Sequence, residues 1–216
     1  MTTKKHELAG TKMKGADMIL QVLADEGVKV IFGYSGGAIL PTYDAIFRWN
    51  RVHKEHPIKL IVPANEQGAG FMASGFARAS GEVGVFLVTS GPGATNATTP
   101  IRDAMADSIP LVMISGQVAR SAVGTDAFQE APVFNLMSSC AKHVFLVEEP
   151  EHLEEIVRTA FYIARTGRPG PVVIDIPKDV QNYEGIFKGK GLLPMHGYQN
   201  RMQKINDNQI TPEEAK

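Results

Sequence analysis

Short runs of apolar and β-branched residues recur along this chain without the polar–apolar alternation of a half-exposed strand. The clearest runs lie at 83–89, 111–115 and 172–176. Strands that are apolar on both faces are typical of a parallel sheet covered by helices on both sides. We therefore expect a mainly parallel sheet of about six strands. The expected strands are 28–32, 59–62, 83–89, 111–115, 141–147 and 172–176.

Segments with helical spacing separate these runs. The expected helices are 16–26, 38–49, 67–79, 99–105 and 151–166. Gly27 follows the first of them, and Gly167 follows the last, as glycine commonly does where a helix ends. Strands that alternate with helices predict a doubly wound α/β fold with helices on both faces of the sheet.

The composition changes near both ends of the chain. Residues 1–13 are polar and are expected to form a flexible leader, and residues 14–181 hold the α/β domain. Residues 182–208 are polar and rich in Gly and Lys, which favours a linker. Thr211 and Pro212 suit an N-cap and a first helical position. Residues 182–216 are therefore interpreted as a linker and the start of a further domain, with a frayed natural tail as the alternative.

Charge and cysteine content narrow the function classes. The 22 basic and 23 acidic side chains nearly cancel, which argues against a nucleic-acid partner. No apolar stretch reaches the roughly 20 residues of a membrane span. The single cysteine, Cys140, cannot form an internal disulfide or a paired-cysteine metal site, and no metal site is predicted. A reducing compartment, the cytoplasm or an organelle matrix, fits this composition.

Four segments that follow expected strands are rich in Gly, Ser, Thr, Asn or Gln. They are 34–37, 65–70, 90–96 and 116–130. Ligands of open α/β sheets bind beyond the carboxyl ends of the strands, where these segments lie. The dinucleotide fingerprint does not fit, because Asn96 stands where its third glycine belongs, and no P-loop motif occurs. Tight turns alone also explain the glycines of any one segment.

Glu66 lies where an expected strand gives way to a helix. One interpretation is a carboxylate that caps the helix and stabilises it by about 0.5–2 kcal/mol. The other is a carboxyl group in a ligand crevice, flanked by apolar strand ends and suited to proton exchange. Gln129 and Glu130 leave the same two interpretations open, since loop side chains are often merely solvated.

Nine motifs, in order, resemble thiamine-diphosphate enzymes and, among them, the acetolactate synthase large subunit family. They are GYSGG at 33–37, EQGA at 66–69, GFARA at 75–79, SGPGATN at 90–96, DSIP at 107–110, GQV at 116–118, GTDAFQE at 124–130, GRPGP at 167–171 and IPKDV at 176–180. The resemblance runs from about Lys14 to Gln181. GTDAFQE together with PKDV is its most specific part, whereas SGPG recurs across the superfamily.

The resemblance implies an enzyme of branched-chain amino-acid biosynthesis. Such an enzyme decarboxylates pyruvate and joins the product to a second 2-keto acid, pyruvate or 2-ketobutyrate. It implies the pyrimidine-binding domain of a homodimer or tetramer, with a regulatory small subunit as a further partner. Two alternatives remain, which are another thiamine-diphosphate enzyme such as a pyruvate oxidase, and a non-catalytic α/β binding or dimerisation module.

Individual roles carry over to matching positions. Glu66 is implied to bind N1′ of the aminopyrimidine ring of thiamine diphosphate. The implied substrate-side residues are Phe128, Gln129 and Lys178. The implied cofactor contacts are Tyr34, Gly36 and Gly37 beside the aminopyrimidine and Arg168 at FAD.

Three departures and one missing motif set limits on the resemblance. Ser35 and Ala119 stand where the family usually has proline, and Asn65 where it usually has histidine. No GDG occurs, so the ligands of Mg²⁺ and of the diphosphate are expected outside these 216 residues. A chain without them is expected to be inactive alone.

Overall fold

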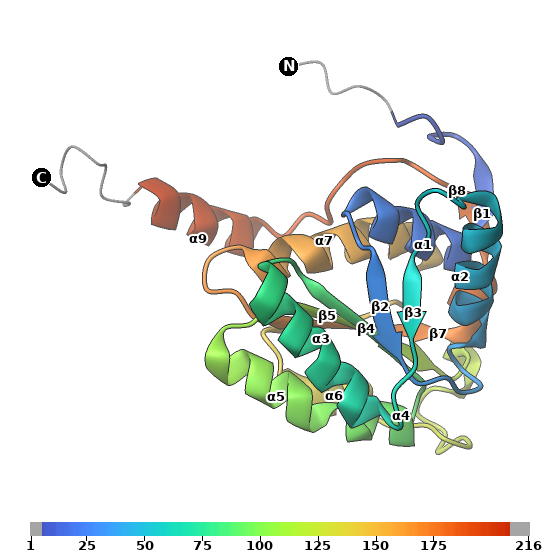
Figure 1. Ribbon diagram of the computed structural model, residues 1–216, viewed down its shortest axis with the longest axis horizontal. Helices are drawn as coiled ribbons and strands as arrows, with labels where there is room; N and C mark the ends of the chain where they lie inside the picture. The colour runs from blue at the N-terminus through green and yellow to red at the C-terminus, as the bar shows by residue number, and fades with distance from the viewer. Residues whose placement is uncertain (1–5, 208–216) are drawn as a thin grey trace, which may run out of the picture.

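The computed structural model describes residues 6–207, which form a three-layer α/β structure (Figure 1). Six parallel strands make the central sheet in the order β3-β2-β4-β5-β7-β6. Their bounds are β2 Val30–Gly33, β3 Lys59–Ile61, β4 Gly84–Val88, β5 Leu111–Gln117, β6 His143–Leu146 and β7 Pro171–Pro177. The predicted fold class, strand number and parallel pairing are confirmed.

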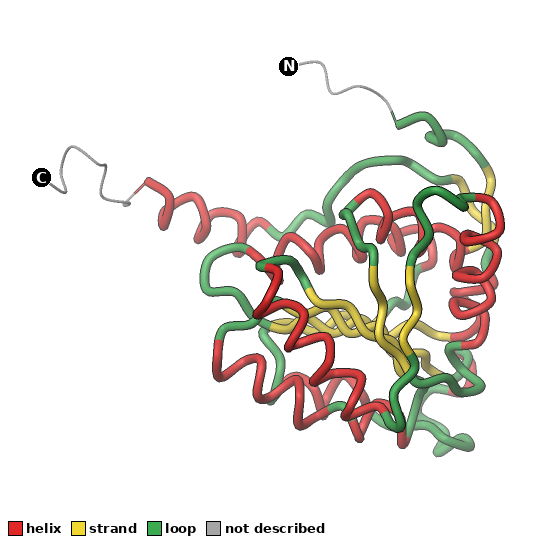
Figure 2. Tube along the Cα trace, in the orientation of Figure 1, coloured by secondary structure: helices red, strands yellow, loops and turns green. Residues whose placement is uncertain are grey.

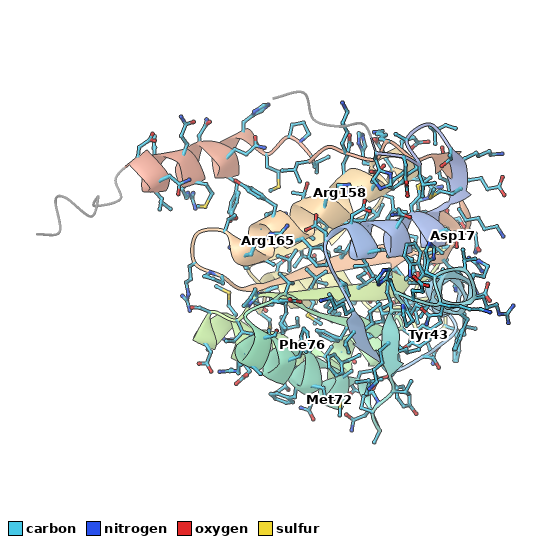
Figure 3. All side chains as sticks on the ribbon, turned by 45° about the horizontal axis from the view of Figure 1, so that its top comes forward. Asp17, Tyr43, Met72, Phe76, Arg158 and Arg165 are labelled. Carbon is cyan, nitrogen blue, oxygen red and sulfur yellow. The ribbon has the colours of Figure 1, made fainter. Side chains whose placement is uncertain are left out.

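Helices cover both faces of this sheet, and Figure 2 shows the strands as the middle layer. The helices are α1 Gly15–Asp25, α2 Leu40–Val52, α3 Glu66–Ser80, α4 Pro92–Asn96, α5 Thr98–Asp107, α6 Val133–Ser138, α7 Leu153–Arg165, α8 Lys178–Asn182 and α9 His196–Asp207. One apolar core lies between the sheet and α1, α2 and α7, and the other between the sheet and α3, α5 and α6. In Figure 3, Met72 and Phe76 lie on α3, and Arg158 and Arg165 lie on α7 across the sheet.

The strand order indicates where this sheet would bind a ligand. From β2 the chain moves to β3 on one side and then crosses to β4 on the other. The carboxyl ends of β2 and β4 therefore lie at the point where the direction of winding reverses, which is where doubly wound sheets bind ligands. The loops from these strand ends gather around α4, at the lower right of Figure 1.

The structure differs from the sequence prediction at both ends of the domain. Strand β1, Lys12–Lys14, pairs antiparallel with β8, Glu184–Ile186, so part of the expected leader and linker is ordered. Phe187 is fully buried and exchanges backbone hydrogen bonds with Gly10 and Thr11. Helix α9 occupies another part of the expected linker. The helix expected from Thr211 lies outside the described residues.

Three short helices were also absent from the prediction. Helix α4 lies inside segment 90–96, α6 follows segment 116–130, and α8 follows β7 directly. All three are five or six residues long, too short to show a helical period. No helix among residues 6–207 is long and apolar enough to cross a membrane.

Asp175 is an acid inside the core. It lies on β7 beside Ser115 of β5, is 1 % exposed, and its Oδ1 has no hydrogen-bond partner among the described residues. Burial raises the pKa of Asp175 to about 7, although the Gln117 amide and the Ser115 hydroxyl oppose the rise. The folded protein therefore retains a proton there that the unfolded chain releases near pH 4.

This difference in proton binding predicts a pH-dependent stability. Between about pH 4 and pH 7 the free energy of unfolding should fall as the pH rises, by up to a few kcal/mol, and the Asp175 contribution should level off above pH 7. Asp175→Asn should remove this slope. Urea unfolding followed by circular dichroism from pH 4.5 to 8 measures it, with Asp207→Asn on the exposed end of α9 as the control. An unchanged slope in Asp175→Asn would contradict the assignment.

Candidate ligand site at the carboxyl edge of the sheet

Glu66 is the first residue of α3 and is only 8 % exposed. The capping role expected as one alternative belongs to its neighbour, because the Asn65 side chain accepts a hydrogen bond from the Gly68 amide at 2.8 Å. The Glu66 carboxylate instead accepts a hydrogen bond from Asn96 Nδ2, at 3.0 Å from Oε2. Its other oxygen, Oε1, has no hydrogen-bond donor among residues 6–207. Glu66 thus has one oxygen fixed and one available.

The loops after β2 and β4 close against one side chain, Thr89. The Thr89 hydroxyl accepts the Ala38 amide N–H at 3.2 Å. A Cβ at Gly36 would lie 2.5 Å from Thr89 Cβ, so only glycine permits this approach. From the other loop, a Cβ at Gly93 would lie 2.8 Å from Thr89 Cγ2 and 3.5 Å from Glu66 Oε1. Gly36, Gly93 and the Glu66 carboxylate therefore meet in one small region.

Gly37 and Tyr34 lie in the same loop after β2. A Cβ at Gly37 would meet nothing within 4 Å, so the loop leaves open space beside it. Tyr34 is 39 % exposed, and its amide donates to the Leu87 carbonyl at 3.2 Å, which fixes the loop to β4. The structure therefore brings Tyr34, Gly36 and Gly37 to the same edge as Glu66. The departure at Ser35 is exposed.

The segment after β5 reaches this edge as well. Phe128 is 87 % exposed, and Gln129 has a left-handed backbone with φ of 59°. A Cβ at Gly91 would lie 2.4 Å from the Gln129 carbonyl oxygen, so the Gln129 backbone packs directly on the loop that carries Gly93. Gln129 and Phe128 are therefore neighbours of the loop beside Glu66.

Lys178 opens the short helix α8, directly after β7, and is exposed. Gln181 of α8 fastens this helix to the loop after β2, since its Nε2 donates to the Ala38 carbonyl at 2.8 Å. Its Oε1 accepts the Thr42 hydroxyl at 2.9 Å. Lys178 thus lies at the same edge of the sheet as Glu66.

Arg168 lies elsewhere. It precedes β7, at the amino edge of the sheet, in the connection from α7 that lies at the left of Figure 1. Its guanidinium donates to the carbonyls of Met105 and Ala106 and to the Ser108 hydroxyl, all at the end of α5. The structure thus places seven of the eight expected site residues at one edge and Arg168 at the other. The FAD contact expected for Arg168 stays a prediction.

Sequence reasoning missed two polar residues near Glu66. Asn96 was noted only for standing where a glycine was sought, although it is the hydrogen-bond donor to Glu66. Tyr43 of α2 is buried, and its hydroxyl has no partner among the described residues (Figure 3). Burial, and secondarily the charge of Glu66, raise the pKa of Tyr43, so it stays a neutral donor. Both residues lie far from Glu66 along the chain, and local patterns did not connect them.

The side chains that meet at this edge suit an organic ring. Residues 6–207 hold no cluster of three His, Cys, Asp or Glu side chains arranged to bind a metal ion. A partly buried carboxyl with one free oxygen, beside glycines that let a ring approach the backbone, suits a heterocycle with a protonatable nitrogen. The arrangement can hold such a ring and exchange a proton with it.

Comparison with known proteins gives one family match. Residues 13–138 match the thiamine pyrophosphate enzyme N-terminal TPP binding domain. The acetolactate synthase large subunit of Haemophilus influenzae is 52 % identical over 171 residues, which cover 79 % of this chain and 29 % of that protein. The mitochondrial acetolactate synthase catalytic subunit of Saccharomyces cerevisiae is 51 % identical, over 78 % of this chain and 24 % of its own length. The chloroplastic acetolactate synthase of Arabidopsis thaliana is 43 % identical, over 88 % and 28 %.

Asn65 caps α3, whereas Glu66 binds Asn96, and this predicts that variants at the two positions differ in their free energy of unfolding. Asn65→Ala removes the side-chain cap of α3 and should lower the free energy of unfolding by about 1 kcal/mol. Glu66→Gln retains an acceptor for Asn96 and should change it less. Urea unfolding of both variants at pH 7 measures the difference. A larger loss in Glu66→Gln than in Asn65→Ala would mean that the carboxylate, and not Asn65, stabilises the start of α3.

Proposed function

Because the chain belongs to the thiamine pyrophosphate enzyme family, we propose that it is the pyrimidine-binding domain of an acetolactate synthase catalytic subunit. The chain spans less than a third of the length of the curated relatives it matches, so the activity proposed is that of a longer protein. The relatives named acetolactate synthase come from bacteria, an archaeon, yeast and plants, which favours this enzyme over other members of the family.

The buried Glu66 carboxyl carries the proposal. With Oε2 held by Asn96, the free Oε1 would bind N1′ of the aminopyrimidine and share a proton with it. The loop of Tyr34, Gly36 and Gly37 would lie along the ring, since Gly37 leaves open space there. When bound, thiamine diphosphate supplies the electron sink for decarboxylating a 2-keto acid.

The remaining residues of the edge would receive the substrate. Phe128 offers an exposed aromatic surface, and Gln129 offers an amide next to the glycine loop. Lys178 adds a positive charge at the same edge, which suits the carboxylate of pyruvate or of 2-ketobutyrate. These positions favour an acyl transfer between two 2-keto acids in branched-chain amino-acid biosynthesis.

The proposal extends to partners and location. Mg²⁺ and the diphosphate would be held by residues outside this chain, and FAD would contact Arg168. The active protein would be a homodimer or tetramer, and the names "large subunit" and "catalytic subunit" of the relatives suggest a regulatory subunit as well. A single cysteine fits a reducing compartment such as the cytoplasm.

A chimera tests the proposal, in which this chain replaces the matched segment of the Haemophilus influenzae relative. Acetolactate formation is measured with pyruvate, thiamine diphosphate, Mg²⁺ and FAD. The chimera should be active, and Glu66→Gln should reduce kcat about 10²- to 10⁴-fold, the usual contribution of a positioned acid–base group.

The matched control is Glu82→Gln, an exposed acid between α3 and β4 at the amino edge of the sheet, which should leave the rate unchanged. The chain alone should be inactive under the same conditions. An active chimera in which Glu66→Gln is as fast as the parent would contradict the acid–base role proposed for Glu66.

A further inference from the structure

Residues 118–131 form a long connection that carries Phe128 and Gln129. Most of its side chains are exposed, and much of it has no regular structure beyond the 3₁₀ turn Arg120–Ala122. Its contact with Gly91 depends on where the Gln129 backbone lies, because those atoms approach closely. Something must therefore fix this connection relative to the sheet.

Two sets of hydrogen bonds lie at the surface of this connection. Arg120 donates through its amide and its Nε to the Asp179 carboxylate, at 3.0 and 2.7 Å. The Glu130 carboxylate accepts the amide N–H groups of Gly124 and Ala127, and these bonds lower the pKa of Glu130. Both sets of hydrogen bonds face solvent, where water and ions compete with them. The Arg120 bonds fix the start of the connection to α8, and the Glu130 bonds fold its tip, but neither joins its two ends.

The base is closed by Gln117, the last residue of β5, which is 2 % exposed. Its Oε1 accepts the Val118 amide N–H at 2.9 Å, at the start of the connection. Its Nε2 donates to the Ala131 carbonyl at 3.0 Å, at the far end. One buried amide therefore pins both ends of a long connection to the same point of the sheet.

Asp175 holds that amide. Gln117 Nε2 also donates to Asp175 Oδ2 at 2.9 Å, from a strand 58 positions further along the chain. The Val118 amide N–H can only donate and the Ala131 carbonyl can only accept, so the Gln117 amide has one orientation, with its Nε2 end toward Asp175. The Oε1 end is then directed at Val118. The two side chains are buried on the sheet face that packs against α3, α5 and α6, so a hydrogen bond lost there leaves a buried polar group unpaired.

We propose that Asp175 is a positioning residue which, through Gln117, closes the base of the 118–131 connection and so holds Phe128 and Gln129 at the carboxyl edge. The inference rests on the proposed function only for what Phe128 and Gln129 receive, namely a 2-keto acid. The closure itself is a property of this chain and needs no cofactor.

Hydrogen exchange of the full 216-residue chain, read by mass spectrometry, tests the closure directly. Asp175→Val leaves an apolar side chain in the core and removes the acceptor, so amides of 118–132 should exchange at least tenfold faster while those of β4 and β5 keep their rates. Asp175→Asn restores an acceptor oxygen for Gln117 and should exchange like the parent. Gln117→Met approaches the same bond from its other end and should loosen the same peptide.

Ser115→Ala is the matched control, since Ser115 is as buried as Asp175 and lies beside it in register, but its side chain makes no hydrogen bond to Gln117 or to the described residues of 118–131. It should leave peptide 118–132 as slow as in the parent. The proposal is overturned if Asp175→Val and Gln117→Met exchange like the parent. It is equally overturned if their faster exchange spreads over the whole sheet, or if Asp175→Asn is as loose as Asp175→Val.

The same variants in the chimera separate this inference from the proposed function. Asp175→Val should raise the KM for pyruvate more than it lowers kcat, and Asp175→Asn should recover it. Exchange results as expected with an inactive chimera would reject the function and keep the closure. An active chimera together with unchanged exchange in Asp175→Val would keep the proposed function and reject the closure.

Discussion

The hydrogen bond from Asn96 to Glu66 joins two segments that follow different strands, and the geometry of the carboxyl edge depends on it. Glu66 follows β3 and Asn96 follows β4, with β2 lying between those strands in the sheet. The bond therefore spans the point where the winding reverses. It leaves one carboxylate oxygen free beside Gly93, in the loop after β4, and a cofactor ring placed there would meet a directed acid–base group.

Other polar side chains fasten the remaining loops to the same edge. Gln181 binds the Ala38 carbonyl, Thr89 binds the Ala38 amide, and Gln117 binds the Ala131 carbonyl. All three side chains are buried, so their bonds stabilise the loops without competition from water. The loops can then present exposed groups such as Phe128 without collapsing onto the sheet. Loops that are fixed to the sheet at their ends and exposed at their tips suit a ligand-binding edge.

Much of this architecture follows from local sequence. Strands β4, β5 and β7 are apolar on both faces, and that pattern alone predicts a covered parallel sheet. Glu66 was placed correctly at the start of a helix because a strand and a small-residue helix flank it. Short elements such as β1 and α6 escaped prediction, since three to six residues show no reliable period.

The partners of the site residues were the part that sequence did not give. Asn96 and Glu66 are 30 positions apart, and Gln117 and Asp175 are 58 apart, so no spacing rule links them. The sequence left open whether Glu66 caps the helix, and only the fold shows that the neighbouring Asn65 bonds Gly68 instead. Tertiary contact, rather than propensity, decides these roles.

Glu66 Oε1 is proposed to receive the aminopyrimidine ring of thiamine diphosphate. A crystal structure of the chimera with that cofactor tests this placement. We expect Glu66 Oε1 within hydrogen-bond distance of N1′, about 2.6–3.2 Å, with Asn96 still bound to Oε2. A bound cofactor whose ring lies away from Glu66 would contradict it.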